Sequence, residues 1–155
     1  MWDELLDAWR VNNRITLFLL DEIDQRGLEC TLSLRGGRTV ARQLAHMHNN
    51  RITRLKSWCP ELANGAQLFA SKEEPGGEEL AGALAESGER VCRYITKASA
   101  GMPGVKTFKR GLVVAIAYLI AHDSHHRGSI MLTLKQCGQK LSQDVQYGIW
   151  DWERR

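Results

Sequence analysis

Three of the five histidines of this chain lie within five positions, in the segment "AHDSHHRGSIMLTLKQCG" at residues 121–138. His122 and His126 are four residues apart, so on a helix their imidazoles project from the same face, with Cβ atoms roughly 6 Å apart. Neutral imidazole nitrogens bind Zn²⁺ and similar ions at roughly 2.0–2.1 Å, and this spacing can supply two of them. The pattern therefore indicates a candidate metal site with His122 and His126 as two ligands.

The alternative interpretation is that one of these rings is a hydrogen-bonded core residue and the others are solvated. The apolar neighbours Leu119 and Ile130 argue against it, because they turn the same face toward the interior, where an unpaired ring is costly. The other two histidines, His46 and His48, lie on a different predicted helix. Facing helices of a bundle build metal sites in this way, and three histidines leave the open coordination position of a catalytic centre.

Only one of His46 and His48 can face such a site, because two residues turn a helix by about 200°. The apolar stripe of this segment consists of Val40, Leu44, Met47, Ile52 and Leu55. His48 lies nearer the centre of that stripe than His46 does, so periodicity alone favours His48 as the third ligand. A helix that buries two of its faces could turn either residue toward the site, so periodicity does not exclude His46 as the ligand.

Two further residues of the motif could take part in chemistry. Asp123 directly follows His122, in the place that the general base takes in HExxH metalloproteases. An aspartate is one methylene shorter than that glutamate. The sequence also lacks the surroundings in which such proteases supply their third metal ligand. We therefore interpret Asp123 as a solvated carboxylate or as one that supports a ligand. His125 points about 100° away from His126 and is expected at the surface or at an interface, not as a ligand.

Apolar residues recur at helical spacing in four stretches, and none of them alternates as a strand would. The predicted helices are residues 2–23, 39–58, 78–98 and 110–138. Gly27 is the expected stop signal after the first helix, Thr39 the N-cap of the second and Gly138 the C-cap of the last. This pattern predicts an all-α protein, a four-helix bundle in a single domain of residues 1–155, with the aromatic tail packed on its body.

Composition excludes several classes of protein. The net charge is only +3 and the basic residues are scattered, so no nucleic-acid partner is expected. No apolar run approaches the roughly 20 residues of a membrane span, and the acidic, amphipathic start "MWDELLDAWR" does not read as a signal peptide. The four cysteines form no CxxC pair. These features predict a cytoplasmic protein with reduced thiols and no membrane partner.

The segment "HDSHHRGSIMLTLKQCG" resembles the H-x-x-H-H-R-G-Q-I signature of the DinB/YfiT-like superfamily. "RTVARQLAHMHNNR" resembles the second helix of that family and "YGIWDW" its tails, so the resemblance covers residues 1 to about 152. Ser129 stands where glutamine is usual. The resemblance implies a four-helix bundle of unusual connection order, often homodimeric. It also implies a divalent metal held by His46, His122 and His126.

Some members of this family are thiol-dependent S-transferases that use bacillithiol, mycothiol or glutathione, whereas others have no assigned activity. By resemblance, the chain could be a metal-dependent transferase or hydrolase of small molecules, with a low-molecular-weight thiol as a second cofactor. Imidazole ligands favour Zn²⁺ or Ni²⁺. The alternative is a non-catalytic, stress-associated bundle with a structural or vestigial metal site. Aromatic residues of the first helix and of the tail, which a lone bundle would leave uncovered, also predict a homodimer.

Overall fold

The computed structural model describes the whole chain except Leu34 and Gly36. Its long helices are α1 (Trp2–Asp21), α3 (Val40–Trp58), α4 (Gly77–Ser99) and α5 (Leu112–Gln136). The short ones are α2 (Gln25–Leu28), the 3-10 helix η1 (Pro60–Leu62) and α6 (Gln143–Gly148). No strand occurs among the described residues, so the predicted all-α class is confirmed. Within the described ranges, none of the helices combines the length and the apolar character that a bilayer crossing requires.

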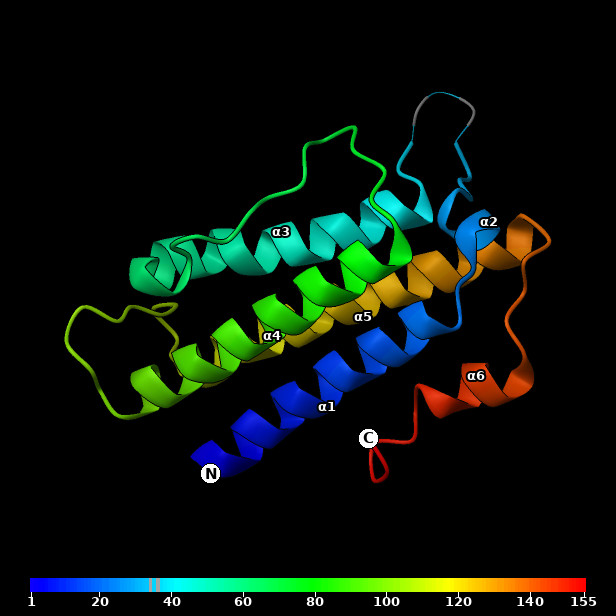
Figure 1. Ribbon diagram of the computed structural model, residues 1–155. Coiled ribbons are helices and arrows are strands. Elements are labelled where there is room, and N and C mark those ends of the chain that lie inside the picture. Colours follow the sequence, from blue (N-terminus) through cyan, green and yellow to red (C-terminus); the bar gives the residue numbers. More distant parts are fainter. Residues whose placement is uncertain (34, 36) are drawn as a thin grey trace.

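The four long helices form a bundle in which each helix packs against two neighbours, in the order α1, α4, α3, α5 around the ring. α1 and α5 run in one direction, and α3 and α4 run in the other (Figure 1). Because α3 and α4 are parallel, the connection between them, residues 59–76, has to return along the length of the bundle. This is an uncommon order for a four-helix bundle, as the family resemblance implied.

Side chains of α3 hold this returning connection in place. The Asn49 amide donates to the Phe69 carbonyl at 2.8 Å and accepts from the Phe69 backbone N–H at 3.0 Å. The Arg42 guanidinium donates twice to the Ser71 carbonyl, at 3.0 and 2.7 Å. The connection is therefore fixed along α3, and this leaves its backbone beside the stretch of α3 that carries His46.

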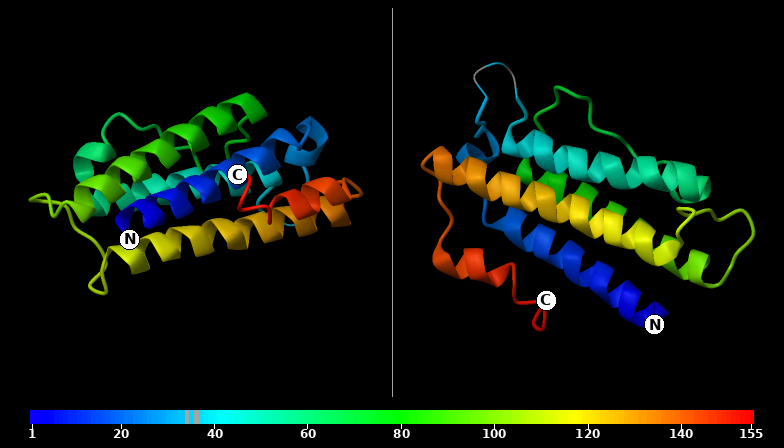
Figure 2. Two further views of the ribbon diagram at one scale, coloured as in Figure 1. Left: turned by 90° about the horizontal axis from the view of Figure 1, so that it is seen from below. Right: turned by 180° about the vertical axis from the view of Figure 1, so that it is seen from behind.

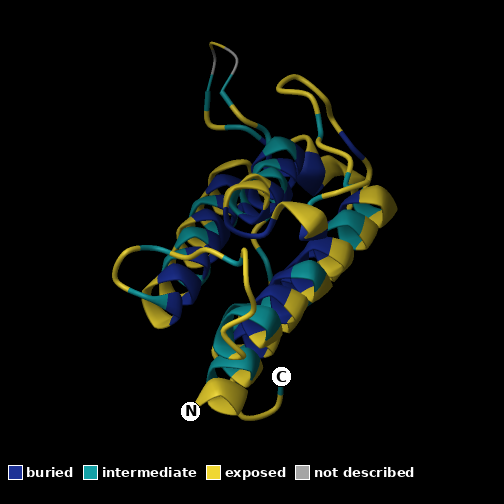
Figure 3. Ribbon diagram, turned by 90° about the vertical axis from the view of Figure 1, so that its left-hand side faces the viewer, coloured by how far each residue is buried: buried dark blue, intermediate teal, exposed yellow. Residues whose placement is uncertain are grey.

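The interior of the bundle has an apolar cluster at each end and a polar layer between them. One apolar cluster includes Leu19, Leu44, Leu84 and Ile130. The other includes Trp9, Leu55, Val91 and Ile116. The buried polar residues between them include Asn12, Arg51, Ser87, Asp123 and Arg127. Figure 3 shows the buried residues turned toward the inside of the bundle on each helix. Since the layer is flanked by apolar clusters, its polar groups must find partners within it.

The helix ends follow the predicted signals at two places and depart from them at one. Thr39 caps α3, because its hydroxyl accepts from the Arg42 N–H at 3.2 Å, and Gly138, with a positive φ of 77°, follows the C-cap residue Cys137 of α5. The predicted first helix, residues 2–23, ends two residues earlier, at Asp21, and Gly27 does not act as its stop signal. Gly27 lies inside α2, where an added Cβ would lie 2.8 Å from Ile23 Cγ2, so close packing explains this glycine.

The C-terminal tail is less covered than expected. α6 buries Val145 against the bundle, but Tyr147 and Trp150 are 72% and 74% exposed. The prediction that the tail aromatics pack on the body was therefore wrong for these two side chains. Trp9, in contrast, is completely buried, and its indole N–H donates to the Gly88 carbonyl at 2.9 Å.

Candidate metal centre

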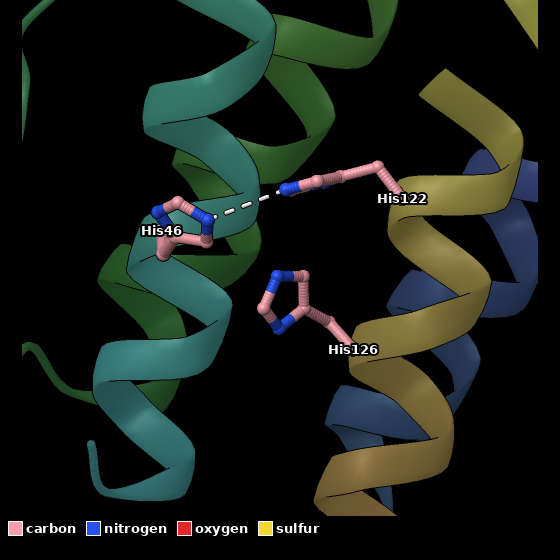
Figure 4. Close-up of side chains that lie close together, drawn as sticks. All are labelled: His46, His122 and His126. Atoms are coloured by element: carbon pink, nitrogen blue, oxygen red, sulfur yellow. Dashed lines mark hydrogen bonds between the residues drawn. The ribbon is translucent and has the colours of Figure 1, made fainter. Parts of the chain in front are cut away.

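Three imidazoles meet in the space between α3 and α5, where His46 reaches across from α3 toward His122 and His126 on α5 (Figure 4). One ring nitrogen from each residue lies within 4.8 Å of the other two. The Nε2 atoms of His46 and His122 are 3.3 Å apart. Two nitrogens bound to one tetrahedral ion at roughly 2.0–2.1 Å would be about 3.4 Å apart. The three rings, called the histidine cluster below, therefore fit a divalent metal ion.

The protonation of the cluster also suits a metal. Burial, the Arg38 cation and the neighbouring His122 lower the pKa of His46 from 6.5 to about 4. Burial and the surrounding histidines, with a smaller effect of Arg38, lower the pKa of His126 to about 4 as well. Both rings are therefore neutral at neutral pH, and each has a lone pair to offer, because a metal ligand must be the unprotonated imidazole.

The cluster contains polar atoms that the described residues leave without hydrogen bonds. The Nδ1 atoms of His122 and His126 are buried, and neither has a hydrogen-bond partner in the described part of the chain. Buried polar atoms without partners are rare in folded proteins, and each one calls for an explanation such as an ion or a functional role. The donor set, its spacing and these unsatisfied atoms agree with a site built for a ligand.

His48 is buried, as the periodicity of its helix indicated, but it does not face α5. Its two ring nitrogens lie 2.9 Å from the Ala83 carbonyl and 2.8 Å from the Gln67 carbonyl. These contacts direct the ring toward α4 and the returning connection. α3 thus buries two faces, one with His48 and one with His46, and only His46 shares the space of His122 and His126.

The other two residues of the motif take different positions. His125 is exposed, as expected, and is not among the residues that converge. Asp123 is completely buried, so the interpretation as a solvated carboxylate was wrong. Its Oδ2 accepts from Arg51 Nη2 at 2.7 Å and from Asn12 Nδ2 at 2.8 Å. Burial by itself raises the pKa of the Asp123 carboxyl, but the Arg51 cation and the hydrogen bonds outweigh it and lower the pKa.

Asp123 belongs to a set of buried side chains that the sequence analysis did not assemble. This arginine network consists of Asn12, Thr16, Arg51, Asp123 and Arg127. Arg127 Nη1 donates to Asn12 Oδ1 at 2.9 Å and to Thr16 Oγ1 at 2.8 Å. The signal for Arg51 was present in its spacing, because it follows Leu44 by seven positions and precedes Leu55 by four, which places it on a buried face.

Two cavities open beside the histidine cluster. One, of about 270 Å³, is lined by His46, Arg42, Phe69 and neighbouring residues. The other, of about 390 Å³, is lined by His126, Gln43, Thr133 and others. Arg38 lines both cavities, and no aspartate or glutamate lines either of them. A small molecule in either cavity would touch a ring of the cluster in a positively charged surrounding.

A four-helix bundle with parallel middle helices and a three-histidine cluster between its second and last long helices defines the class of this protein. The family model described as "DinB family" matches residues 1–146. The chain belongs to the DinB family, and the resemblance seen in the sequence is confirmed. No curated protein matches the chain with significant similarity.

Proposed function

We propose that this protein is a metal-dependent enzyme in which His46, His122 and His126 hold Zn²⁺ or Ni²⁺. It acts on a small molecule, either as a thiol S-transferase or as a hydrolase. A divalent ion held by three imidazoles supplies Lewis acidity and lowers the pKa of a water or thiol that binds to it. The remaining chemistry depends on what the chain places around the three rings.

The observation that carries this proposal is that the three histidine rings converge on one point and that two of them also line cavities. A structural metal site is closed by four protein ligands, whereas a catalytic site keeps a position for water or substrate. His46 lines one cavity and His126 lines the other. The described residues contribute three ligands to the cluster and not a fourth. Both features are typical of a catalytic site.

The charge around the cavities favours an anionic reactant. Arg38 borders both cavities and is exposed, and the lining of both includes no acidic residue. A guanidinium at this place attracts a carboxylate or a thiolate and orients it by hydrogen bonds. In S-transfer, the thiol sulfur forms a carbon–sulfur bond with the electrophile, the thiol proton passes to solvent, and the displaced group leaves with the bonding electron pair.

The test combines metal content with an activity screen. Protein purified without a histidine tag should contain about one equivalent of divalent metal per chain. Loaded protein should consume electrophiles in the presence of thiol donors, or hydrolyse esters and amides without them. His122→Ala should lose both metal and activity. His125→Ala is the matched control for metal content and should keep the metal, because His125 is an exposed histidine on the same helix and is not among the three that converge.

Two outcomes would count against the proposal. Full metal content in His122→Ala would overturn the site itself. Stoichiometric metal without turnover of any thiol, ester or amide substrate would favour the alternative, a non-catalytic bundle with a structural metal.

A further inference from the structure

The carboxylate of Asp123 is held at one oxygen and open at the other. Its Oδ2 accepts from both Arg51 Nη2 and Asn12 Nδ2. Its Oδ1 is buried and has no hydrogen-bond partner among the described residues. A carboxylate oxygen can only accept, so the open Oδ1 lacks a donor.

The position of this carboxylate is fixed by contacts on the far side of the network. Arg127 can only donate, so the Asn12 oxygen faces Arg127 and the Asn12 nitrogen faces Asp123. Arg51 is in turn held by the Asn13 side chain at 2.7 Å and by the Leu84 carbonyl at 3.0 Å. α1, α3 and α4 thus all contribute to holding the open Oδ1 of Asp123 in one orientation.

A candidate donor for Oδ1 is the preceding side chain on α5, His122. His122 Nδ1 is buried without a partner in the described part of the chain, and it lies 3.9 Å from Asp123 Oδ1. This distance is longer than a formed hydrogen bond, so the His122 ring has to turn toward Asp123 for the bond to form. The opposite nitrogen of the same ring, Nε2, faces His46 at 3.3 Å.

We propose that Asp123 is a positioning residue: its Oδ1 accepts the Nδ1–H of His122 and holds the ring in the tautomer whose Nε2 lone pair faces His46 and His126. The proposal rests on the metal site proposed above. A ligating histidine generally donates its other ring N–H to a carboxylate or a carbonyl, which fixes its tautomer and orientation. The arginine network then has a function beyond packing, because it aims a carboxylate at the metal ligand.

Asp123→Asn tests this by reversing one hydrogen bond. Arg51 and Asn12 both donate to this side chain, so the asparagine must turn its oxygen toward them. Its NH₂ group then faces His122 Nδ1 and donates to it. The proton of His122 should therefore move from Nδ1 to Nε2, the nitrogen that faces His46 and His126.

The first measurement needs no metal. Long-range ¹H–¹⁵N spectra of the metal-free protein should show His122 as the Nδ1–H tautomer in the wild type and as the Nε2–H tautomer in Asp123→Asn. If Asp123 only neutralises Arg51, the tautomer should be the same in both proteins, and that result would overturn the proposal. If the variant does not fold, an Nε2–H tautomer in the wild type alone would overturn it.

The second measurement is metal affinity, with Thr16→Val as the matched control. Thr16 lies in the same network but bonds to Arg127 and the Asn12 carbonyl, away from His122. Zn²⁺ affinity in competition with a chelator should fall by about 10- to 100-fold in Asp123→Asn and stay unchanged in Thr16→Val. Equal affinity in all three proteins would contradict the proposal. A wild type that binds no Zn²⁺ would defeat the proposed function while the tautomer result still decides the role of Asp123.

Discussion

The histidine cluster and the arginine network lie next to each other on α5, yet they differ in how closely their side chains are bonded to one another. Side chains of the arginine network contact one another at 2.7–2.9 Å, through Arg51–Asp123, Asn12–Asp123 and Arg127–Asn12 pairs. In the histidine cluster, the only hydrogen bond within the set is the 3.3 Å contact between His46 and His122. Neighbouring residues of one helix, His122 and Asp123, thus belong to two different kinds of polar site.

This difference distinguishes polar side chains that stabilise the packing of the helices from polar side chains that are available to bind a ligand. A buried ion pair with further hydrogen bonds has its desolvation largely offset, and it ties α1, α3 and α5 to one packing arrangement. Imidazoles that are buried with unpaired nitrogens are a cost to the folded protein until something binds them. Places where local rules of packing are broken are commonly functional sites. The histidine cluster is such a place, and the arginine network lies next to it and fixes the position of Asp123, the neighbour of His122.

Breaking the arginine network should have the largest effect on stability. Arg51→Met removes the cation from Asp123, which is buried with 1% of its side chain exposed, and leaves an unpaired buried charge. The free energy of unfolding should fall by about 3–5 kcal/mol. Urea unfolding of the metal-free protein, followed by tryptophan fluorescence, measures this.

The control for Arg51→Met is a surface pair of the same type. Arg154 pairs with Asp151 at 3.5 Å, and 84% of its side chain is exposed. Arg154→Met should change the free energy of unfolding by no more than about 1 kcal/mol. Equal losses in the two variants would mean that the network contributes no more than a solvated ion pair.

The two histidines of α3 provide the next test, because His48 contacts two backbone carbonyls and His46 belongs to the histidine cluster. His46→Ala should remove the metal-dependent part of the stability, which is about 2.7 kcal/mol when free metal is 100 times its Kd. His48→Ala should leave that part intact and destabilise the protein by about 1–3 kcal/mol with or without metal, because the ring that contacts the Ala83 and Gln67 carbonyls is lost.

Melting curves with Zn²⁺ and with a chelator, together with metal content, separate these two effects. If His48→Ala loses the metal while His46→Ala keeps it, the periodicity of the helix was the better guide to the ligand and our assignment is wrong.

Most of the fold could be predicted from the sequence, because its signals are local. Helical periodicity and the Thr39 cap placed the long helices to within a few residues. The role of Gly27 was predicted wrongly, because glycine is both a common helix terminator and a residue that allows close packing. Sequence position cannot separate these two uses, since the second depends on the contact with Ile23, which forms only in the folded chain.

The site could be predicted only in part, for a similar reason. The spacing of His122 and His126 fixes their shared face before any folding is known. His46 and His48 are both turned toward neighbours, one to α5 and the other to α4, and only the order of helices around the bundle tells which face meets which neighbour. The burial of Asp123 depends on Arg51 and Asn12, which are distant in sequence and show no motif.

Acid should weaken the histidine cluster before the arginine network. The pKa of His46 and of His126 is lowered from 6.5 to about 4 in the folded protein, so between these values the unfolded chain binds more protons. The stability of the metal-free protein is therefore full above about pH 6.5 and declines as the pH falls toward 4. Allowing for solvent screening, the loss is on the order of 1–2 kcal/mol.

Urea unfolding at several pH values between 4 and 7.5 tests this slope. The double variant His46→Gln/His126→Gln should flatten it, because glutamine does not titrate. A slope that is the same in the wild type and in the double variant would assign the acid sensitivity to other groups.

The outward face of α5 differs from both polar clusters, since it is exposed and uncharged. Between Leu112 and Leu134 the charged residues of this helix, Asp123 and Arg127, are both buried. The exposed residues in this stretch are Val113, Val114, Ala117, Ala121, Ser124, His125, Gly128 and Leu132. Seen from behind, α5 crosses the front of the bundle with no helix over it (Figure 2). Small side chains on such a face allow another helix to approach closely.

We propose that the chain forms a homodimer and that the two copies meet through this face of α5. Ala121→Glu would place a charge, and its copy in the partner, in the middle of that contact, so the variant should be monomeric in light scattering at micromolar concentrations. The free energy of unfolding of a single chain should change by less than about 0.5 kcal/mol, because Ala121 is exposed. Lys135→Glu, at the exposed end of the same helix, is the control and should leave the mass of the dimer unchanged.

A wild type that is a clean monomer across that range would refute the dimer. A dimer that survives Ala121→Glu would move the contact to the exposed Tyr147 and Trp150 of the tail.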